Sequence, residues 1–265
     1  KQSFKKFILN IKSNGVLVMN KDDINSMDVL NQVKKQLLKK NVSIYTFSLS
    51  DPTANIYAKN ISCNIKGFYS FDVTDNETGK TYSYYLTVPG IHNVYDALAA
   101  ITTAHAHGIK FEDMKKTLNE FCGAKRRFEL KANLGNNILV YDDYSHHPTE
   151  IKATLAAAKQ KHPNKIIAIF QPHTYSRTKE LLDDFSSAFF DADVVIMPNI
   201  YAAREIDDGS ISSKDLVKRL KEQNLDAHYI EDFSEIVKYV KSIAQPNDII
   251  LTLGAGDVTK ISDMF

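Results

Sequence analysis

The segment ILVYDDYSHHPTEI, residues 138–151, decides the fold of the second half of the chain. An apolar run leads into it and an alanine-rich helical pattern follows, which predicts a strand, a polar turn and a helix beginning near Pro148. The turn holds two carboxylates, a phenol and two imidazoles, whereas a simple reversal uses Gly, Asn, Asp or Ser. These groups suit a ribose, a metal-bound phosphate or proton transfer. Taken alone, the pair His146 and His147 fits a solvated loop equally well.

The alternation of strands and helices continues to the end of the chain. The expected strands are 138–141, 165–170, 193–197, 227–230 and 248–253, and the expected helices between them are 151–158, 181–189, 216–220 and 233–243. Such regular alternation is typical of α/β proteins and predicts a doubly wound, mostly parallel sheet.

Polar clusters follow four of these strands at their carboxyl ends. They are residues 142–147, 171–177, 199–205 and 254–257. In open parallel sheets, ligands bind beyond the carboxyl ends of the strands. The loops at the opposite ends, 161–164 and 245–247, have ordinary turn composition. The sequence therefore predicts one binding site at the carboxyl edge of the sheet.

The first half has a different character. A strand at 15–20, a helix through Leu38 and a strand at 42–47 form a β-α-β unit with parallel strands. Residues 56–88 are rich in aromatic and β-branched residues and predict an antiparallel sheet. The tyrosines there are interpreted as packing residues, because base stacking would need basic residues between them. Asp22 and Asp23 are interpreted as favouring the dipole of the following helix, with catalysis as the alternative.

Two segments near the middle of the chain are candidates for nucleotide binding. His92 and Asn93 fall in the first turn of an expected helix, where an imidazole and an amide could hold a purine, although Asn93 could also be a simple cap. Three cations, at 125–127, follow a glycine where the first half ends. A charge run is usually solvated, but an arginine at a domain junction suits a phosphate, because its planar fork binds two oxygens.

Composition narrows the functional classes. The chain has 265 residues, a 43% hydrophobic fraction and a net charge of +1, which fits two globular domains rather than a nucleic-acid-binding protein. No apolar run reaches membrane-spanning length, so membrane insertion is not expected. The two cysteines, Cys63 and Cys122, show no metal spacing and are expected to be reduced thiols in a cytoplasmic protein. Oligomeric state is left open.

Several of these segments together resemble the Mur ligases of peptidoglycan synthesis. The matching segments are PGIHN (89–93), RRFE (126–129), DDYSHHPTE (142–150), FQPHTYSRT (170–178), IYAARE (200–205) and GAGD (254–257). They occur in the family's order and span nearly the whole chain. Within the family, they are most similar to members that join L-alanine to UDP-N-acetylmuramate.

The resemblance implies an ATP-dependent, amide-forming ligase. In this family a carboxylate attacks the γ-phosphate of ATP, and an amine then displaces phosphate from the acyl phosphate. The resemblance implies that His92 and Asn93 flank the adenine, that Arg127 holds the γ-phosphate, and that Asp143 orients the ribose or that arginine. Arg127, Asp143 and His146 are the residues expected to serve catalysis.

The resemblance also implies an amino-acid site. Its expected members receive L-alanine through imidazoles, a phenol, a guanidinium and backbone N–H groups; they are Tyr144, His146, His173, Arg177, Gly254, Ala255 and Gly256. Arg177 would bind the carboxylate of the alanine. His147, Tyr175 and Glu205 are further candidates. No residue of this chain is expected to bind a metal.

The chain also departs from the family pattern. Asp96 stands where relatives often have a second asparagine, and Thr174 stands where many have a second arginine. The chain contains no phosphate-binding Gly-x-x-x-x-Gly-Lys-[Ser/Thr] loop. We therefore expect a carboxyl-terminal portion of a longer enzyme, inactive by itself, whose Mg²⁺ ligands lie mainly upstream. Residues 1–123 would be the latter half of a mixed-sheet ATP-binding domain, and 124–265 a Rossmann-like amino-acid-binding domain.

Two alternatives remain open. A recycling ligase would add a ready-made peptide to the same nucleotide sugar, and would need a wider amino-acid pocket. A non-catalytic module that binds a nucleotide or an amino acid would explain the missing phosphate loop. A hydrolase built on His146, His147 and Asp143 is disfavoured, because no serine or cysteine elbow accompanies them.

Overall fold

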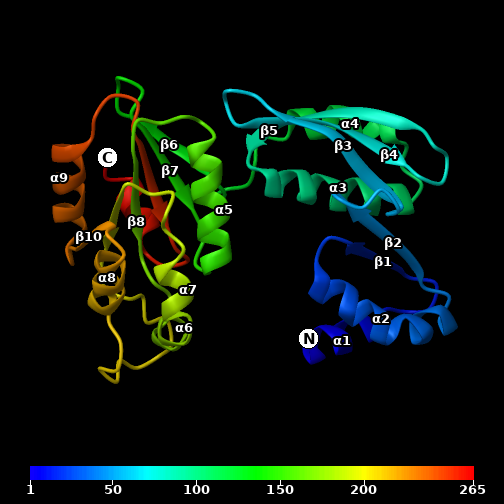
Figure 1. The fold of residues 1–265 in the computed structure, drawn as a ribbon, viewed down its shortest axis with the longest axis horizontal. Helices are drawn as coiled ribbons and strands as arrows, with labels where there is room; N and C mark the ends of the chain where they lie inside the picture. The colour runs from blue at the N-terminus through cyan, green and yellow to red at the C-terminus, as the bar shows by residue number, and fades with distance from the viewer. The chain divides into compact units, whose positions relative to one another are not determined.

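The computed structural model describes residues 1–265 and contains two compact units, Lys1–Cys122 and Gly123–Phe265. Each unit has its own β-sheet, and most of the strands and helices are labelled in Figure 1. The expected domains, 1–123 and 124–265, differ from these units by one residue. Their assignment to ATP and to the amino acid stays a prediction. No helix combines the length and apolar character needed to cross a membrane.

Unit 1 is a mixed α/β unit with one five-stranded sheet in the order β1-β2-β3-β4-β5. β1, β2 and β3 pair in parallel, whereas β3, β4 and β5 pair antiparallel. Its elements are α1 (Gln2–Leu9), β1 (Val16–Asn20), α2 (Ile24–Lys39), β2 (Ser43–Ser48), β3 (Ile56–Cys63), β4 (Phe68–Asp75), β5 (Thr81–Pro89), α3 (Ile91–Ala106) and α4 (Phe111–Glu120). The parallel β-α-β unit and the antiparallel strands were both predicted, and the sheet joins them through β3.

Several tyrosines of unit 1 pack in or against its core, as the sequence predicted. Tyr84 is 3% exposed, and its hydroxyl donates to the carbonyl oxygen of Phe111 at 2.9 Å. Tyr82 stacks on the ring of Phe111 with centroids 4.6 Å apart. Tyr82 and Tyr84 of β5 therefore fix α4 against the sheet. Burial also raises the pKa of Tyr84 above its usual range.

Asp22 joins the carboxyl end of β1 to two other segments. Its carboxylate accepts hydrogen bonds from the backbone N of Leu49 at 2.7 Å, from Ser50 Oγ at 2.6 Å and from the Tyr95 hydroxyl at 3.1 Å. Burial alone would raise its pKa, but these bonds and one from Ser48 lower it below the usual range. Asp23 is the N-cap of α2 and accepts from the backbone N of Ser26. Asp23 therefore stabilises the start of α2, as interpreted from the sequence. Asp22 instead forms tertiary hydrogen bonds that connect β1 to two other segments.

Unit 2 contains a six-stranded sheet in the order β10-β9-β8-β11-β7-β6. All neighbours are parallel except β6, which is antiparallel to β7 at one edge. Its elements are β6 (Glu129–Asn133), β7 (Leu139–Asp143), α5 (Pro148–Lys159), β8 (Ile166–Phe170), α6 (Tyr175–Glu180), α7 (Leu182–Ser186), β9 (Val194–Met197), α8 (Ser213–Glu222), β10 (Asp226–Tyr229), α9 (Phe233–Ile243), β11 (Ile249–Leu253) and α10 (Thr259–Ser262). The predicted doubly wound, mostly parallel sheet is confirmed.

The sheet of unit 2 buries apolar side chains on both faces. In β8, Ile166, Ala168 and Phe170 face one core cluster, which includes residues of α5, α7 and α8. The alternate residues, Ile167 and Ile169, face a second cluster that includes residues of α9 and α10. Because every residue of β8 is buried, the strand is a continuous apolar run, as expected for a central parallel strand.

Several details differ from the predictions for secondary structure. The helix predicted at 181–189 is only the short helix α7, Leu182–Ser186, although Phe185 and Phe189 of the predicted stripe are fully buried. Four elements were not predicted. These are the edge strand β6, in which no residue is fully buried, and the helices α1, α6 and α10.

Glu205, in the segment after β9, fixes the start of α6. It accepts hydrogen bonds from Thr174 Oγ1 at 2.6 Å and from the backbone N of Ser176 at 2.9 Å. This carboxylate satisfies an N–H group of the first helical turn, which has no partner inside the helix. The hydrogen bonds from Ser176 and Thr174 lower the pKa of Glu205 to about 2.

We expect Asp22→Asn to destabilise unit 1 by about 2 kcal/mol, because hydrogen bonds to a charged acceptor are lost and the donors of Leu49 and Tyr95 remain. Hydrogen exchange measured separately for the two units checks this. Asp28→Asn, on the exposed face of α2, is the matched control. Equal exchange in the two variants would contradict a tertiary role for Asp22.

The lowered pKa of Glu205 predicts a pH-dependent contribution to stability. Because the folded-state pKa is about 2 and the ordinary value is 4.5, the contribution is complete above about pH 4.5 and is lost as pH falls through 2. The difference in Tm between the wild type and Glu205→Gln should therefore be largest at neutral pH and vanish near pH 2. Glu180→Gln, at the other end of α6, is the control. A difference that does not change with pH would contradict the assignment.

Candidate functional site

The predicted polar clusters lie along one edge of the second sheet. β7, β11 and β8 are adjacent and parallel, and their last residues, Asp143, Leu253 and Phe170, are in register. The segments that follow these strands therefore begin side by side. The cluster after β9 joins them through a parallel bridge between His173 and Tyr201. The structure thus places all four clusters at the same edge, and their roles in binding stay predictions.

Aromatic rings and imidazoles gather at this edge. The rings of His146 and His173 have centroids 6.0 Å apart, and the ring of Tyr144 lies 5.3 Å from that of His146. His173 stacks on Tyr201 at 5.5 Å with an interplanar angle of 13°. Tyr201 was not among the predicted site residues. Its position within the IYAARE segment was the sequence feature that could have identified it as a site residue.

Arg177 is held beside His173. Its Nη1 donates to the backbone oxygen of His173 at 2.8 Å and lies 3.3 Å from His173 Nδ1. No carboxylate forms an ion pair with Arg177, so an anionic ligand would meet an uncompensated guanidinium. Burial lowers the pKa of His173, and the nearby charges of Arg177 and His146 lower it further. His173 is therefore neutral at pH 7, and its ring can accept a proton.

His146 and His147 have separate positions. His146 Nδ1 lies 2.9 Å from the backbone oxygen of Tyr144 and 3.4 Å from Glu150 Oε2. His147 is the N-cap of α5, and its Nδ1 accepts from the backbone N of Thr149 at 3.3 Å. The structure therefore gives His147 a local role in capping and brings His146 to the predicted site.

Asp143 is 5% exposed, and both of its oxygens accept hydrogen bonds from the protein. One accepts from the backbone N of Phe128 at 2.7 Å, and the other accepts from the backbone N of Ser145 at 2.8 Å and from its hydroxyl. Asp143 thus fixes the 126–128 segment to the end of β7. A direct contact of Asp143 with a ribose stays a prediction. The bond to Phe128, the residue after Arg127, is more in keeping with the alternative role of positioning Arg127.

The two arginines of the RRFE segment differ in their surroundings. Arg127 is exposed, lies 5.8 Å from the centroid of the Tyr144 ring, and forms no ion pair with a carboxylate. Arg126 is half-buried and pairs with Asp142 at 3.0 Å. The predicted contact of Arg127 with a phosphate stays a prediction. The interactions of Arg126 and Asp142 were not predicted, because the sequence does not show which of two adjacent residues turns into the protein.

The glycine segment after β11 is closely packed. A Cβ on Gly256 would lie 2.6 Å from the Tyr201 ring and 2.7 Å from Gln171 Oε1, so only glycine fits there. A Cβ on Gly254 would lie 2.9 Å from the backbone oxygen of Gln171, and its φ of 146° also favours glycine. The N–H groups of Ala255 and Gly256 donate no hydrogen bond within the protein. Their role in binding the amino acid stays a prediction.

His92 and Asn93 belong to unit 1 and lie in the first turn of α3. The N-cap is Gly90, so the interpretation of Asn93 as the cap is wrong. Asn93 Nδ2 instead donates to the backbone oxygen of Pro89 at 2.7 Å and lies 3.2 Å from His92 Nε2. These contacts orient the two side chains relative to each other. Their contact with adenine stays a prediction.

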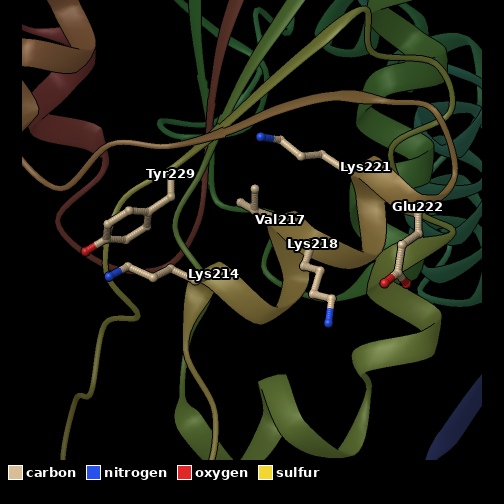
Figure 2. A pocket seen from close by; sticks show the side chains of 6 residues that line it. All are labelled: Lys214, Val217, Lys218, Lys221, Glu222 and Tyr229. Carbon is tan, nitrogen blue, oxygen red and sulfur yellow. The ribbon is translucent and has the colours of Figure 1, made fainter.

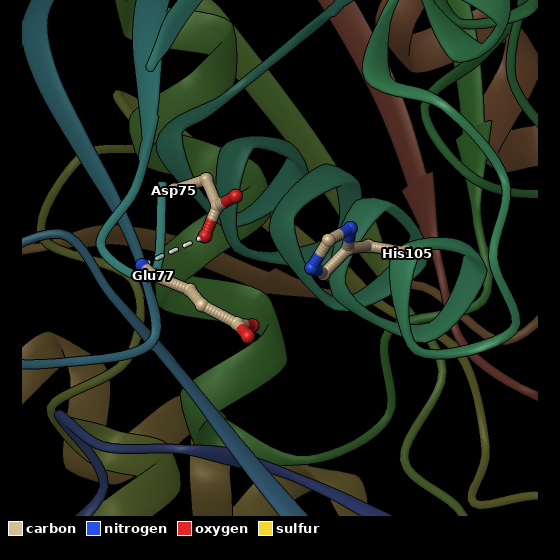
Figure 3. Close-up of side chains that lie close together, drawn as sticks. All are labelled: Asp75, Glu77 and His105. Atoms are coloured by element: carbon tan, nitrogen blue, oxygen red, sulfur yellow. Dashed lines mark hydrogen bonds between the residues drawn. The ribbon is translucent and has the colours of Figure 1, made fainter. Parts of the chain in front are cut away.

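Two other groupings contain none of the predicted site residues. A shallow pocket beside α8 is lined by Lys214, Val217, Lys218, Lys221, Glu222 and Tyr229 (Figure 2). In unit 1, ligand atoms of Asp75, Glu77 and His105 lie within 4.8 Å of one another (Figure 3). Asp75 already accepts from the backbone N of Glu77 and from the Thr78 hydroxyl, so its carboxylate closes the hairpin turn.

The chain matches two descriptions within one protein family. Residues 1–104 match the Mur ligase middle domain, and residues 126–256 match the Mur ligase, glutamate ligase domain. A curated relative from Acetivibrio thermocellus, named UDP-N-acetylmuramate–L-alanine ligase, is 47% identical over 266 residues, which cover 100% of this chain and 55% of the relative. A relative of the same name from Caldicellulosiruptor bescii is 45% identical over 264 residues. The chain spans about half the length of the curated relatives it matches.

Solved structures agree with these matches. The UDP-N-acetylmuramate-alanine ligase from Thermotoga maritima superposes with a TM-score of 0.73 at 26% identity, covering 100% of this chain and 60% of that one. A murein peptide ligase from Psychrobacter arcticus superposes with a TM-score of 0.70 at 25% identity, covering 99% of this chain and 53% of that one. The matched domains, the shared fold and the motifs at the carboxyl edge of the second sheet together show that this chain belongs to the Mur ligase family.

Proposed function

We propose that this chain is part of an ATP-dependent ligase that joins L-alanine to UDP-N-acetylmuramate in peptidoglycan synthesis. One observation carries the proposal. An uncompensated guanidinium, Arg177, lies at the same sheet edge as His146, His173 and the free N–H groups of the glycine segment. A guanidinium and backbone N–H groups suit an amino acid's carboxylate, and imidazoles suit its amine. The names of the curated relatives support L-alanine as that amino acid.

The proposed reaction has two steps. A carboxylate oxygen of UDP-N-acetylmuramate attacks the γ-phosphorus of ATP, which releases ADP and leaves an acyl phosphate. Phosphoryl transfer depends mainly on positioning and on neutralising charge. The exposed Arg127 would stabilise the charge of the γ-phosphate, and Asp143 would hold its segment in place through Phe128. His92 and Asn93 would contact the adenine.

In the second step the amine of L-alanine attacks the acyl carbon, and the tetrahedral intermediate expels phosphate. The amine must be unprotonated before the attack and must lose a proton afterwards, so a nearby base is needed. His146 is the proposed catalytic base, and His173, which is neutral at pH 7, would assist it. Tyr144 would line the site, and Arg177 and the N–H groups of Ala255 and Gly256 would bind the alanine carboxylate.

The proposal also includes the cofactors ATP and Mg²⁺ and a cytoplasmic location. ATP is the expected energy source, and Mg²⁺ would neutralise its phosphates. At the carboxyl edge of unit 2, Asp142 and Asp143 are both used in internal hydrogen bonds. We therefore propose that the Mg²⁺ ligands come from the part of the relatives that this chain does not span. The cytoplasm is the proposed location.

The direct test is release of phosphate from ATP and UDP-N-acetylmuramate by this chain with its upstream portion restored. L-Alanine, D-glutamate and a short peptide would be offered separately. Turnover with L-alanine alone supports the proposal. Turnover only with peptide would instead support a recycling ligase, which the likeness to the murein peptide ligase makes the second candidate. No turnover with any of them would favour a binding module.

We expect Arg177→Ala to weaken the use of L-alanine by roughly 2–5 kcal/mol, because an ion pair with the substrate carboxylate is lost. Steady-state kinetics of the restored enzyme should show this as a higher KM for L-alanine with little change in the KM for ATP. Lys179→Ala, an exposed cation on the same helix, is the control. An unchanged KM for L-alanine would remove Arg177 from the site.

The 265-residue chain alone is expected to bind its ligands weakly and to release no phosphate, because it contains no phosphate-binding loop. Phosphate release by the isolated chain and by the restored enzyme should be compared at equal concentrations. ATP turnover by the isolated chain would show that the phosphates are held by residues other than those proposed.

A further inference from the structure

Arg126 connects three segments at the carboxyl edge of the second sheet. We propose that Arg126 is a positioning residue that orients the glycine segment 254–256 and Tyr144 for the incoming amino acid. The inference rests on the proposed function, because it names the residue that sets the shape of that amino-acid site. It concerns Arg126 alone, and Arg127 keeps its proposed role with the phosphate.

The guanidinium of Arg126 donates hydrogen bonds to two different segments of the chain. Its Nε donates to Asp142 Oδ2 at 3.0 Å, and its Nη2 donates to the backbone oxygen of Gly254 at 2.6 Å. The planar fork of arginine holds these two donors in a fixed relative direction. A lysine has the same charge but a single nitrogen, so it cannot reproduce both bonds with this geometry.

Asp142 anchors this arrangement. It is fully buried, and it also accepts from Thr252 Oγ1 at 2.6 Å and from Thr259 Oγ1 at 2.9 Å. Thr252 precedes the glycine segment and Thr259 follows it. The carboxylate therefore fixes both ends of the segment, and Arg126 connects the same carboxylate to Gly254 within it. A buried carboxylate requires such partners, because an unpaired buried charge is costly.

The contact at Gly254 determines where the free N–H groups point. The backbone N of Gly254 donates to the backbone oxygen of Asp143 at 3.1 Å, and its carbonyl oxygen accepts from Arg126. Both sides of this residue are thus fixed. The carbonyl group of Gly254 and the N–H of Ala255, the first of the two free donors, belong to the same planar peptide group. Rotation of the Gly254 carbonyl would turn that donor away.

Arg126 also holds Tyr144. The carbonyl oxygen of Arg126 accepts from the backbone N of Tyr144 at 2.8 Å, and its guanidinium carbon lies 4.8 Å from the centroid of the Tyr144 ring. Cation–π contacts favour this placement of the ring. Arg126 therefore contacts two parts of the proposed amino-acid site without having to touch the substrate.

The kinetic test uses Arg126→Lys in the enzyme with its upstream portion restored. Arg219→Lys, an exposed arginine of α8 that lies 3.7 Å from Asp183, is the matched control. We expect the KM for L-alanine to rise at least about tenfold in Arg126→Lys, as for one lost charged hydrogen bond, while the KM for ATP changes less than about twofold. A merely structural role would lower the amount of active enzyme and leave both KM values unchanged, which would overturn the proposal.

A second measurement does not depend on activity. Hydrogen exchange of the 265-residue chain should show the hydrogen-bonded amides of Gly254 and Val258 exchanging about tenfold faster in Arg126→Lys than in Arg219→Lys, with β8 and β9 unchanged. Equal exchange in the two variants would overturn the positioning role. If the unsubstituted enzyme shows no turnover that depends on L-alanine, the proposed function fails, and the exchange result alone then decides whether Arg126 orders the segment.

Discussion

The parallel hydrogen bonding of β7, β11 and β8 is the constraint on which the candidate site depends. Parallel neighbours must end at the same edge, so residues that are distant in sequence become neighbours wherever these strands stop. The glycine segment, the double-histidine turn and the histidine–arginine segment meet for this reason. The strands themselves supply almost no chemistry, because their side chains fill the two cores. Most of the candidate site therefore lies in the segments that follow the strands, with Asp143 at the end of β7 and Arg177 in α6, and the sheet fixes where each segment starts.

Much of this arrangement could be predicted because its signals are periodic. The alternation of short apolar runs with helical stripes predicted the second sheet, and the composition of the inter-element segments predicted its functional edge. The elements that were predicted wrongly or not at all have weak or interrupted patterns of apolar residues. Strand β6 is a partly exposed edge strand without a buried stripe. Phe185 and Phe189 of the predicted helical stripe are both buried, although the helix α7 ends at Ser186. Burial periodicity reports which residues face the core, and it says less about where a helix starts and ends.

The sequence was less informative about which of two similar neighbours does what. Asp142 and Asp143 are adjacent in β7 and point to opposite faces of the sheet, so they join different networks. Arg126 adopts a left-handed φ of 56° and turns into the protein, whereas Arg127 stays exposed. Asn93 fits the pattern of a cap, but the cap is Gly90. In each case the answer depends on tertiary hydrogen bonds, which no local pattern contains.

The order of the strands also has a consequence for how unit 2 is made. β11 is the last strand in the chain, yet it lies between β7 and β8 and pairs with both. During synthesis, β7 and β8 leave the ribosome without the strand that separates them. Their facing edges stay unpaired until β11 arrives, and unpaired edges invite association with other chains. The sheet of unit 2 can therefore be completed only after β11 has been made, and without β11 it would be divided into β10-β9-β8 and β7-β6.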